Sequence, residues 1–139
     1  MTIAAVVITK DEEKNIADCL ESLRWADELI VVDAESRDRT VELAKQYTPK
    51  VFVRPWPGYG PQKNFGIDQA AAEWILVVDA DERVTGGLRR EIDALLATAP
   101  AADIATVANA VVGGVGEVSF VVGASDTGTV AIQLGDHNG

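Results

Sequence analysis

Residues 74–82 form the segment most able to do chemistry, because a continuous apolar run leads directly into Asp79 and Asp81. Alternate side chains of an extended backbone share a face, so these two carboxylates can converge just beyond the end of a strand. Mg²⁺ and Mn²⁺ prefer such oxygen ligands and keep positions open for water or phosphate. The spacing therefore favours a metal site for phosphate chemistry. In the alternative interpretation Asp79 only caps a helix and Asp81 is only solvated, so the accompanying residues must decide.

The elements that position these carboxylates alternate in type up to Pro100. Apolar β-rich runs predict strands at residues 3–8, 29–32, 51–53 and 74–78. Amphipathic spacing predicts helices at residues 12–23, 40–47, 62–72 and 87–99, with a Pro/Gly loop at 54–61. Alternating strands and helices imply right-handed crossovers and a mostly parallel α/β sheet with helices on both faces. In such sheets ligands bind beyond the carboxyl ends of the strands.

Polar side chains follow several of the predicted strands at that edge. They are Thr9, Asp11 and Glu12 after the first strand, Asp33 after the second, and Asp79 and Asp81 after the fourth. Taken alone, Asp33 could equally well cap a helix or form a turn. Acidic groups after several strands of one sheet favour a shared ligand site.

Composition limits the classes of function. The 139 residues correspond to one domain, and 47% hydrophobic with 24% charged residues indicates a globular chain. The formal net charge of −10 disfavours nucleic acid as a partner, because phosphates would be repelled. A phosphorylated ligand would need local neutralisation, which a carboxylate-held cation could provide.

Cysteine usage and hydropathy suggest a cytoplasmic location. Cys19 is the single cysteine, and its helical spacing with Ile16, Leu20 and Leu23 indicates a packed core residue. The N-terminal residues show no basic leader, and no apolar run approaches the ~20 residues that span a bilayer. We therefore expect neither secretion nor a membrane span.

The chain changes character after Pro100. All 12 Lys and Arg precede this proline, and the rest is rich in Gly, Ala and Val. Apolar runs at residues 118–122 and 129–132 predict short strands separated by glycines. We expect a domain at residues 1–100 and a divergent, largely β tail of unknown role at 101–139, whose exposed edges would favour self-association.

The polar strand ends are embedded in a recognisable series of motifs. These are ITKDEEKNI at residues 8–16, VVDAESRDRT at 31–40, RPWPGYGPQKNF at 54–65 and DADE at 79–82. Together, over about residues 2–98, they resemble the donor-binding half of family 2 glycosyltransferases, especially the bacterial group that adds sugars to the lipopolysaccharide core. The resemblance implies a shortened GT-A, Rossmann-like fold. It also implies inverting, metal-dependent transfer from a nucleotide-diphospho-sugar to a glycan or lipid-linked acceptor of the cell envelope.

The resemblance implies roles at the nucleoside end of the donor. Thr9 and Glu12 match positions that line the nucleotide pocket, and Asp33 matches the aspartate that accepts a hydrogen bond from the base. Trp56 and Tyr59 could stack on a ring of the ligand or simply pack in their loop.

Further matches concern the phosphates and the metal. Lys63 and Asn64 match the basic residue and asparagine near the diphosphate. Asp79 matches the acid near the ribose, and Asp81 matches the ligand of the Mg²⁺ or Mn²⁺ ion, with Asp79 beside it. A cation and Lys63 would offset charge on the departing diphosphate.

Two departures from the family pattern leave other functions open. Asp11 stands where the family usually has asparagine. Nothing after Pro100 matches the acceptor half of the family, which supplies the general base. Glu82 is not expected to replace that base, because its sequence neighbours assign it to the metal loop. The alternative is therefore a nucleotide-sugar-binding module without turnover. A haloacid-dehalogenase-type phosphatase is disfavoured because Arg83 stands where that motif needs Thr or Val. Association with the periphery of the inner membrane remains a further expectation.

Overall fold

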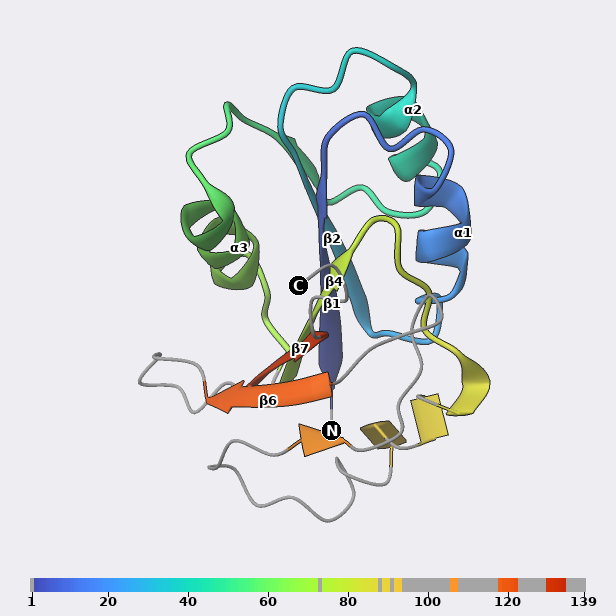
Figure 1. Ribbon diagram of the computed structural model, residues 1–139, viewed down its shortest axis with the longest axis vertical. Coiled ribbons are helices and arrows are strands. Elements are labelled where there is room, and N and C mark those ends of the chain that lie inside the picture. The colour runs from blue at the N-terminus through green and yellow to red at the C-terminus, as the bar shows by residue number, and fades with distance from the viewer. Residues whose placement is uncertain are drawn as a thin grey trace.

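The computed structural model describes residues 2–72, 74–87, 89–90 and 92–93, and the backbone of residues 106–107, 118–122 and 130–134 (Figure 1). These residues build one seven-stranded sheet in the order β3-β2-β1-β4-β7-β6-β5. The strands are β1 (Ile3–Thr9), β2 (Glu28–Asp33), β3 (Val51–Val53), β4 (Trp74–Asp79), β5 (Thr106–Val107), β6 (Val118–Val122) and β7 (Val130–Leu134).

The sheet is mostly parallel, as the sequence predicts. Strand β1 lies between β2 and β4 and runs parallel to both, and β3 and β7 continue the parallel part on either side. Strands β6 and β5 are antiparallel additions at one edge. The apolar runs expected at residues 118–122 and 129–132 correspond to β6 and β7, and β7 pairs directly with β4.

Helices cover both faces of the sheet (Figure 1). Every residue of β1 is buried, because alternate side chains enter two separate apolar cores. Val7 and Val31 face the core shared with α1 (Ile16–Glu21) and α2 (Thr40–Ala44). Val6 and Val32 face the core that includes Phe65 of α3 (Tyr59–Asp68). The predicted fold class is therefore confirmed.

The bounds of α3 differ from those predicted. The helix begins at Tyr59 and ends at Asp68, whereas the pattern suggested residues 62–72. Gly58, the residue before the helix, adopts φ 115°, a backbone conformation that residues with a side chain rarely adopt. Pro61 is tolerated because it lies in the first turn, where its missing N–H is not needed.

The predicted helix at residues 87–99 is described only in part. Residues 86–87, 89–90 and 92–93 are helical, and the rest of that prediction lies outside the described residues. No helix within the described part of the chain is both long and apolar enough to cross a membrane.

Candidate functional site

The carboxyl ends of β1, β2 and β4 meet at one edge of the sheet. Thr9 is in register with Asp33, and Ile8 is in register with Asp79. Strand alternation nevertheless separates the side chains at this edge. Thr9 and Asp33 each lie two residues after a side chain that faces α1 and α2, so they start toward that face. Asp79 lies two residues after Val77, which faces α3, so it starts toward the opposite face.

Asp33 is turned inward and holds the loop that follows β2. Its Oδ1 accepts hydrogen bonds from the Thr9 hydroxyl at 2.6 Å and the Ser36 hydroxyl at 2.6 Å. Its Oδ2 accepts from the Ser36 backbone N–H at 2.7 Å. Asp33 is 0% exposed. Most of its acceptor capacity is therefore used within the protein, and a contact with a base remains a prediction.

The loops after β1 and β2 are tied to each other. The Lys10 ammonium donates to the Glu35 carbonyl at 3.0 Å, and the Asp11 N–H donates to the Ser36 hydroxyl at 2.7 Å. The Arg37 N–H donates to Asp11 Oδ1 at 2.8 Å. Asp11 and Glu35 both adopt left-handed backbones, with φ of 50° and 56°. Such conformations are unfavourable for non-glycine residues, so these contacts stabilise a strained edge.

Asp38 and Thr40 brace this pair of loops. Asp38 accepts hydrogen bonds from the Thr40 N–H at 3.0 Å, from the Thr40 hydroxyl, and from the Glu13 N–H at 3.1 Å. The Thr40 hydroxyl in turn accepts from the Glu12 N–H at 2.8 Å. Desolvation acts to raise the pKa of Asp38, but hydrogen bonds from Thr40 and from backbone N–H groups lower it overall. These contacts agree with a bracing role.

The turn after β4 is closed by Glu82. Its Oε1 accepts from the Asp79 N–H at 2.9 Å, and its own N–H donates to the Asp79 carbonyl at 2.9 Å. Glu82 is fully buried, whereas Asp79 is half-buried and Asp81 is exposed. Asp81 is therefore the acid of this turn that a ligand can reach directly. Within the described ranges, no three acidic, His or Cys side chains gather as a metal-binding group.

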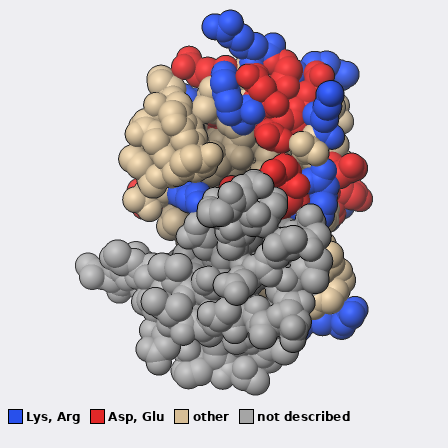
Figure 2. Space-filling model, in the orientation of Figure 1, with Lys and Arg blue, Asp and Glu red and all other residues tan. Residues whose placement is uncertain are grey.

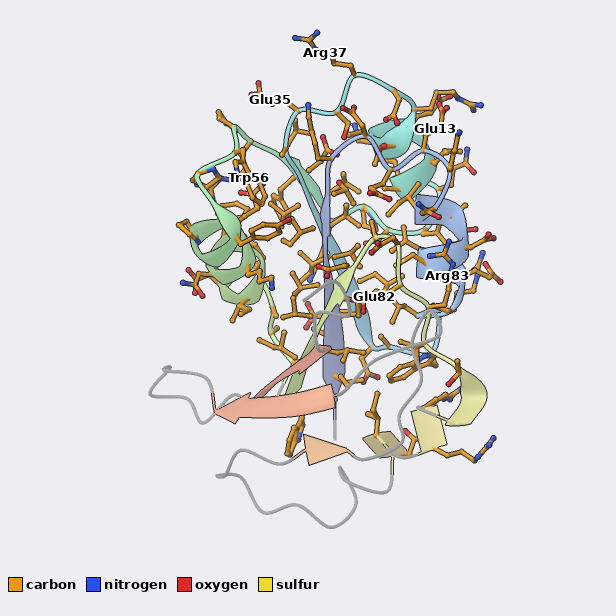
Figure 3. The ribbon with its side chains drawn as sticks, viewed as in Figure 1. Glu13, Glu35, Arg37, Trp56, Glu82 and Arg83 are labelled. Atoms are coloured by element: carbon orange, nitrogen blue, oxygen red, sulfur yellow. The ribbon has the colours of Figure 1, made fainter. Side chains whose placement is uncertain are left out.

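Arg83 links this turn to the loop after β1. Its guanidinium donates to the Ala80 and Glu82 carbonyls and, at 3.1 Å, to Asn15 Oδ1. The Asn15 amide donates to Glu12 Oε2 at 3.0 Å. Arg83 lies on the α1 side of the molecule, away from Trp56 and Glu35 (Figure 3). Glu12 is thereby fixed at the end of a polar chain that joins two strand ends.

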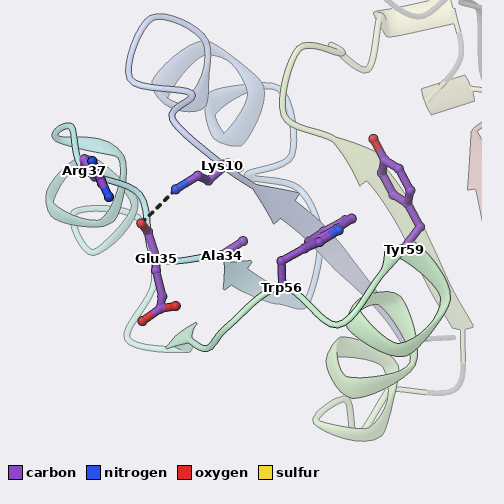
Figure 4. Close-up of a pocket in the computed structure, with 6 residues that line it drawn as sticks. All are labelled: Lys10, Ala34, Glu35, Arg37, Trp56 and Tyr59. Carbon is purple, nitrogen blue, oxygen red and sulfur yellow. Dashed lines mark hydrogen bonds between the residues drawn. The ribbon is translucent and has the colours of Figure 1, made fainter.

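A pocket of about 810 Å³ lies between the residues that follow β1 and β2 and the loop that leads into α3 (Figure 4). Among the described residues it is lined by Lys10, Ala34, Glu35, Arg37, Trp56 and Tyr59. Of the residues predicted to bind the nucleotide or the metal, Thr9 and Asp33 are sequence neighbours of this lining, and none belongs to it. Sequence reasoning missed Lys10, Glu35 and Arg37, although all three lie within the quoted motifs.

The pocket combines aromatic and cationic groups. Trp56 and Tyr59 make an edge-to-face contact with ring centres 4.8 Å apart, and they are 46% and 67% exposed. The Lys63 ammonium lies 5.7 Å from the centre of the Tyr59 ring, and Asn64 is exposed beside it. Acidic and basic side chains intermingle over the upper part of the molecule (Figure 2). The net charge of −10 therefore does not make this edge uniformly acidic.

The sequence profile described as Glycosyl transferase family 2 matches residues 4–116. The chain belongs to this family. It is 44% identical over 97 residues to a glycosyltransferase of Rickettsia felis, covering 69% of this chain and 34% of that protein. It is 34% identical over 102 residues to the lipopolysaccharide core biosynthesis glycosyltransferase LpsC of Rhizobium meliloti, covering 70% and 38%. The chain thus spans about a third of the length of the curated relatives it matches.

Solved structures of glycosyltransferases share the fold. The S. aureus TarS 1-349 structure in complex with UDP-GlcNAc superposes with a TM-score of 0.58 and 28% identity, over 70% of this chain and 31% of that chain. Glucosyl-3-phosphoglycerate synthase from Mycobacterium tuberculosis, in complex with Mn²⁺, UDP and glucosyl-3-phosphoglycerate, gives 0.63 at 22% identity, over 74% and 42%. The latter likeness concerns the fold alone.

Proposed function

We propose that this chain binds a nucleotide-diphospho-sugar and forms the donor half of a glycosyltransferase. The observation that carries the proposal is the pocket at the carboxyl edge of the sheet, which lies against Lys10, Arg37 and the Trp56–Tyr59 pair. Flat aromatic surfaces suit a base or a sugar, and cations suit the phosphates. Its volume of about 810 Å³ lies within the range usual for small-molecule sites.

The turn after β4 fits a divalent cation. Asp81 is exposed and Asp79 is half-buried, so their carboxylates offer the hard oxygen ligands that Mg²⁺ or Mn²⁺ requires. Such ions are often held by one or two carboxylates, with substrate phosphates and water completing the shell. When bound there, the cation would neutralise the diphosphate. Lys63, which is half-buried, and Asn64, which is exposed, lie in α3 and would bind the same diphosphate.

The remaining parts of the proposal rest on family membership. We propose inverting transfer to a glycan or lipid-linked acceptor of the cell envelope. The likeness to LpsC supports the class of acceptor. We also propose a cytoplasmic location, peripheral contact with the inner membrane, and self-association through sheet edges. The division into a donor-binding region at 1–100 and a tail at 101–139 is also kept as a proposal.

Donor binding without transfer is the second candidate. It is favoured by the burial of Glu82, an acid of the proposed metal loop, which is held in the turn after β4 and is not placed to deprotonate an acceptor. Binding and transfer therefore have to be measured separately.

The test is calorimetric titration of the full chain with UDP, UDP-glucose and UDP-GlcNAc, with and without Mn²⁺. We expect binding that strengthens with the metal, together with a rise in melting temperature. Hydrolysis or transfer of labelled sugar from the same donors then separates the enzyme from the binding module. Absence of binding by every nucleotide diphosphate and sugar nucleotide, with metal present, would contradict the proposal.

A further inference from the structure

Gln62 is a buried side chain whose polar atoms are unused. It is 0% exposed, and neither its amide nitrogen nor its amide oxygen has a hydrogen-bond partner among the described residues. Leaving buried donors and acceptors unpaired costs free energy, and most buried polar groups are therefore paired. A methionine or leucine would fill the same volume without this cost. The amide thus points to a partner that the protein alone does not provide.

The position of Gln62 follows from its neighbour one turn along α3. A Cβ added at Gly66 would lie 2.4 Å from Val6 Cγ1 and 3.1 Å from Val32 Cγ2, so this face of α3 presses on β1 and β2. Gln62 is on the same face, one turn nearer the start of the helix. Because α3 runs back across the sheet, that turn lies toward the carboxyl ends of β1 and β2.

This placement puts Gln62 near two residues that line the pocket, although Gln62 itself is not part of the lining. One helical turn corresponds to about two residues of strand, which leads from Val32 to Ala34. Ala34 lines the pocket, and so does Tyr59, three residues before Gln62. Tyr59 is 67% exposed and can move aside without disturbing the core. A rotamer change of the flexible Gln62 side chain would then bring its amide to the pocket.

The hydrogen-bonding groups of the Gln62 amide indicate which part of the sugar nucleotide it would bind. Gln62 offers a donor and an acceptor side by side. A diphosphate only accepts hydrogen bonds and would satisfy half of this group, whereas the edge of a nucleobase carries an adjacent donor and acceptor. Asp33, the residue expected to read the base, is already engaged by Thr9 and Ser36. Little acceptor capacity of Asp33 is left for a base, so a second side chain that binds the base edge would add specificity.

We propose that Gln62 is a specificity-determining residue that pairs through its side-chain amide with the edge of the donor's nucleobase. The inference rests on the proposed function, because it requires a nucleotide in the pocket. It goes beyond the resemblance, which assigns ligand contacts to the neighbouring Lys63 and Asn64 and none to this residue.

The test compares the parent chain with Gln62→Met, and uses Gln69→Met at the other end of α3 as the matched control. Each protein is titrated with UDP, CDP, GDP and ADP in the presence of Mn²⁺. We expect Gln62→Met to bind the preferred diphosphate ~10–100-fold more weakly and to lose most of the preference between bases. Its melting temperature without ligand should equal or exceed that of the parent, because an unpaired amide has been removed. Gln62→Leu serves the same purpose if the methionine variant does not fold.

The outcomes separate the two proposals. If the parent binds nucleotides and Gln62→Met binds them with the same affinity and preference, the inference about Gln62 is wrong and the donor-binding function stands. A loss that is equal for all four bases also overturns it, because such a loss indicates a phosphate or ribose contact. If the parent binds none of the diphosphates, the proposed function fails and the inference fails with it.

Discussion

The hydroxyl of Thr9 donates a 2.6 Å hydrogen bond to the carboxylate of Asp33, across 24 positions of sequence. This bond joins the ends of β1 and β2 inside the protein, and Ser36 completes it from the following loop. The arrangement makes Asp33 a structural support for the pocket wall that contains Ala34 and Glu35. Effects of changing Asp33 on ligand binding must therefore be separated from effects on stability.

Asp33→Ala should lower the free energy of unfolding by on the order of 2–4 kcal/mol, because it leaves the buried Thr9 hydroxyl and the half-buried Ser36 donors without their acceptor. It should also weaken nucleoside binding, since the pocket wall loses its support. Urea denaturation measures the first effect and calorimetry the second. Asp68→Ala, which removes an exposed carboxylate at the end of α3, is the matched control. Parent-like stability combined with weaker nucleoside binding would instead show that Asp33 contacts the ligand directly.

Asp81→Ala should remove the metal-dependent part of donor binding and leave the fold intact. The side chain is exposed, so its loss disturbs no buried contact. Calorimetric titration with UDP, with and without Mn²⁺, gives the metal-dependent gain in affinity for parent and variant. We expect the gain to disappear in Asp81→Ala and to persist in Asp68→Ala. An unchanged affinity in the presence of the metal would refute the assignment.

Trp56→Ala should weaken nucleotide-sugar binding by about three- to tenfold, as expected for the loss of one aromatic contact. The Trp56 side chain is 46% exposed, so the melting temperature should change little. Tyr59→Phe keeps the ring and should bind like the parent, whereas Tyr59→Ala should resemble Trp56→Ala. If both alanine variants bind normally, the pair only packs within its own loop.

Six of the described strands could be predicted from the sequence because most of their residues are apolar, whereas the two-residue β5 (Thr106–Val107) was not predicted. The bounds of β3 agree with the prediction, since Val51–Val53 is flanked by polar and loop-forming residues. The start of α3 could not be predicted, because it depends on the positive φ that Gly58 adopts. The left-handed backbones of Asp11 and Glu35, which shape the pocket edge, have no signature in composition or periodicity.

The prediction that acidic residues follow several adjacent strand ends is confirmed by the register of β1, β2 and β4. The direction of their side chains is a separate matter. Asp33 lies two residues after Val31 on the α1 and α2 side, and Asp79 lies two residues after Val77 on the α3 side. Counting this alternation would have shown that the two carboxylates start toward opposite faces. Their roles toward a ligand stay predictions.

The thiol of Cys19 should be unreactive in the native protein. Burial raises its pKa from 9.0 to about 12, with Arg83 opposing this shift, and its Sγ lies 3.7 Å from the Asp79 carbonyl oxygen. Because the folded pKa is raised, the contribution of this thiol to stability should be constant below pH 9 and should fall between pH 9 and about 12 by up to about 1.4 kcal/mol per pH unit. At pH 8 a disulfide-exchange reagent should label Cys19 only to the extent that urea unfolds the protein. Cys19→Ala should remove the fall in unfolding free energy that this thiol causes above pH 9. Rapid labelling without urea would contradict the burial.

Gly66→Ala and Gly60→Ala form a matched pair within α3. A methyl group at Gly66 would lie 2.4 Å from Val6 Cγ1, so α3 must shift away from β1 and β2. We expect a loss of about 1–3 kcal/mol in unfolding free energy, measured with urea, and weaker nucleotide binding because Gln62 shifts with the helix. Among the described residues, none has an atom within 4 Å of a Cβ added at Gly60 outside its own stretch of helix, so alanine there should be neutral or slightly stabilising. Equal stability of the two variants would mean that α3 does not press on the sheet through this face, and the position inferred for Gln62 would then lose its support.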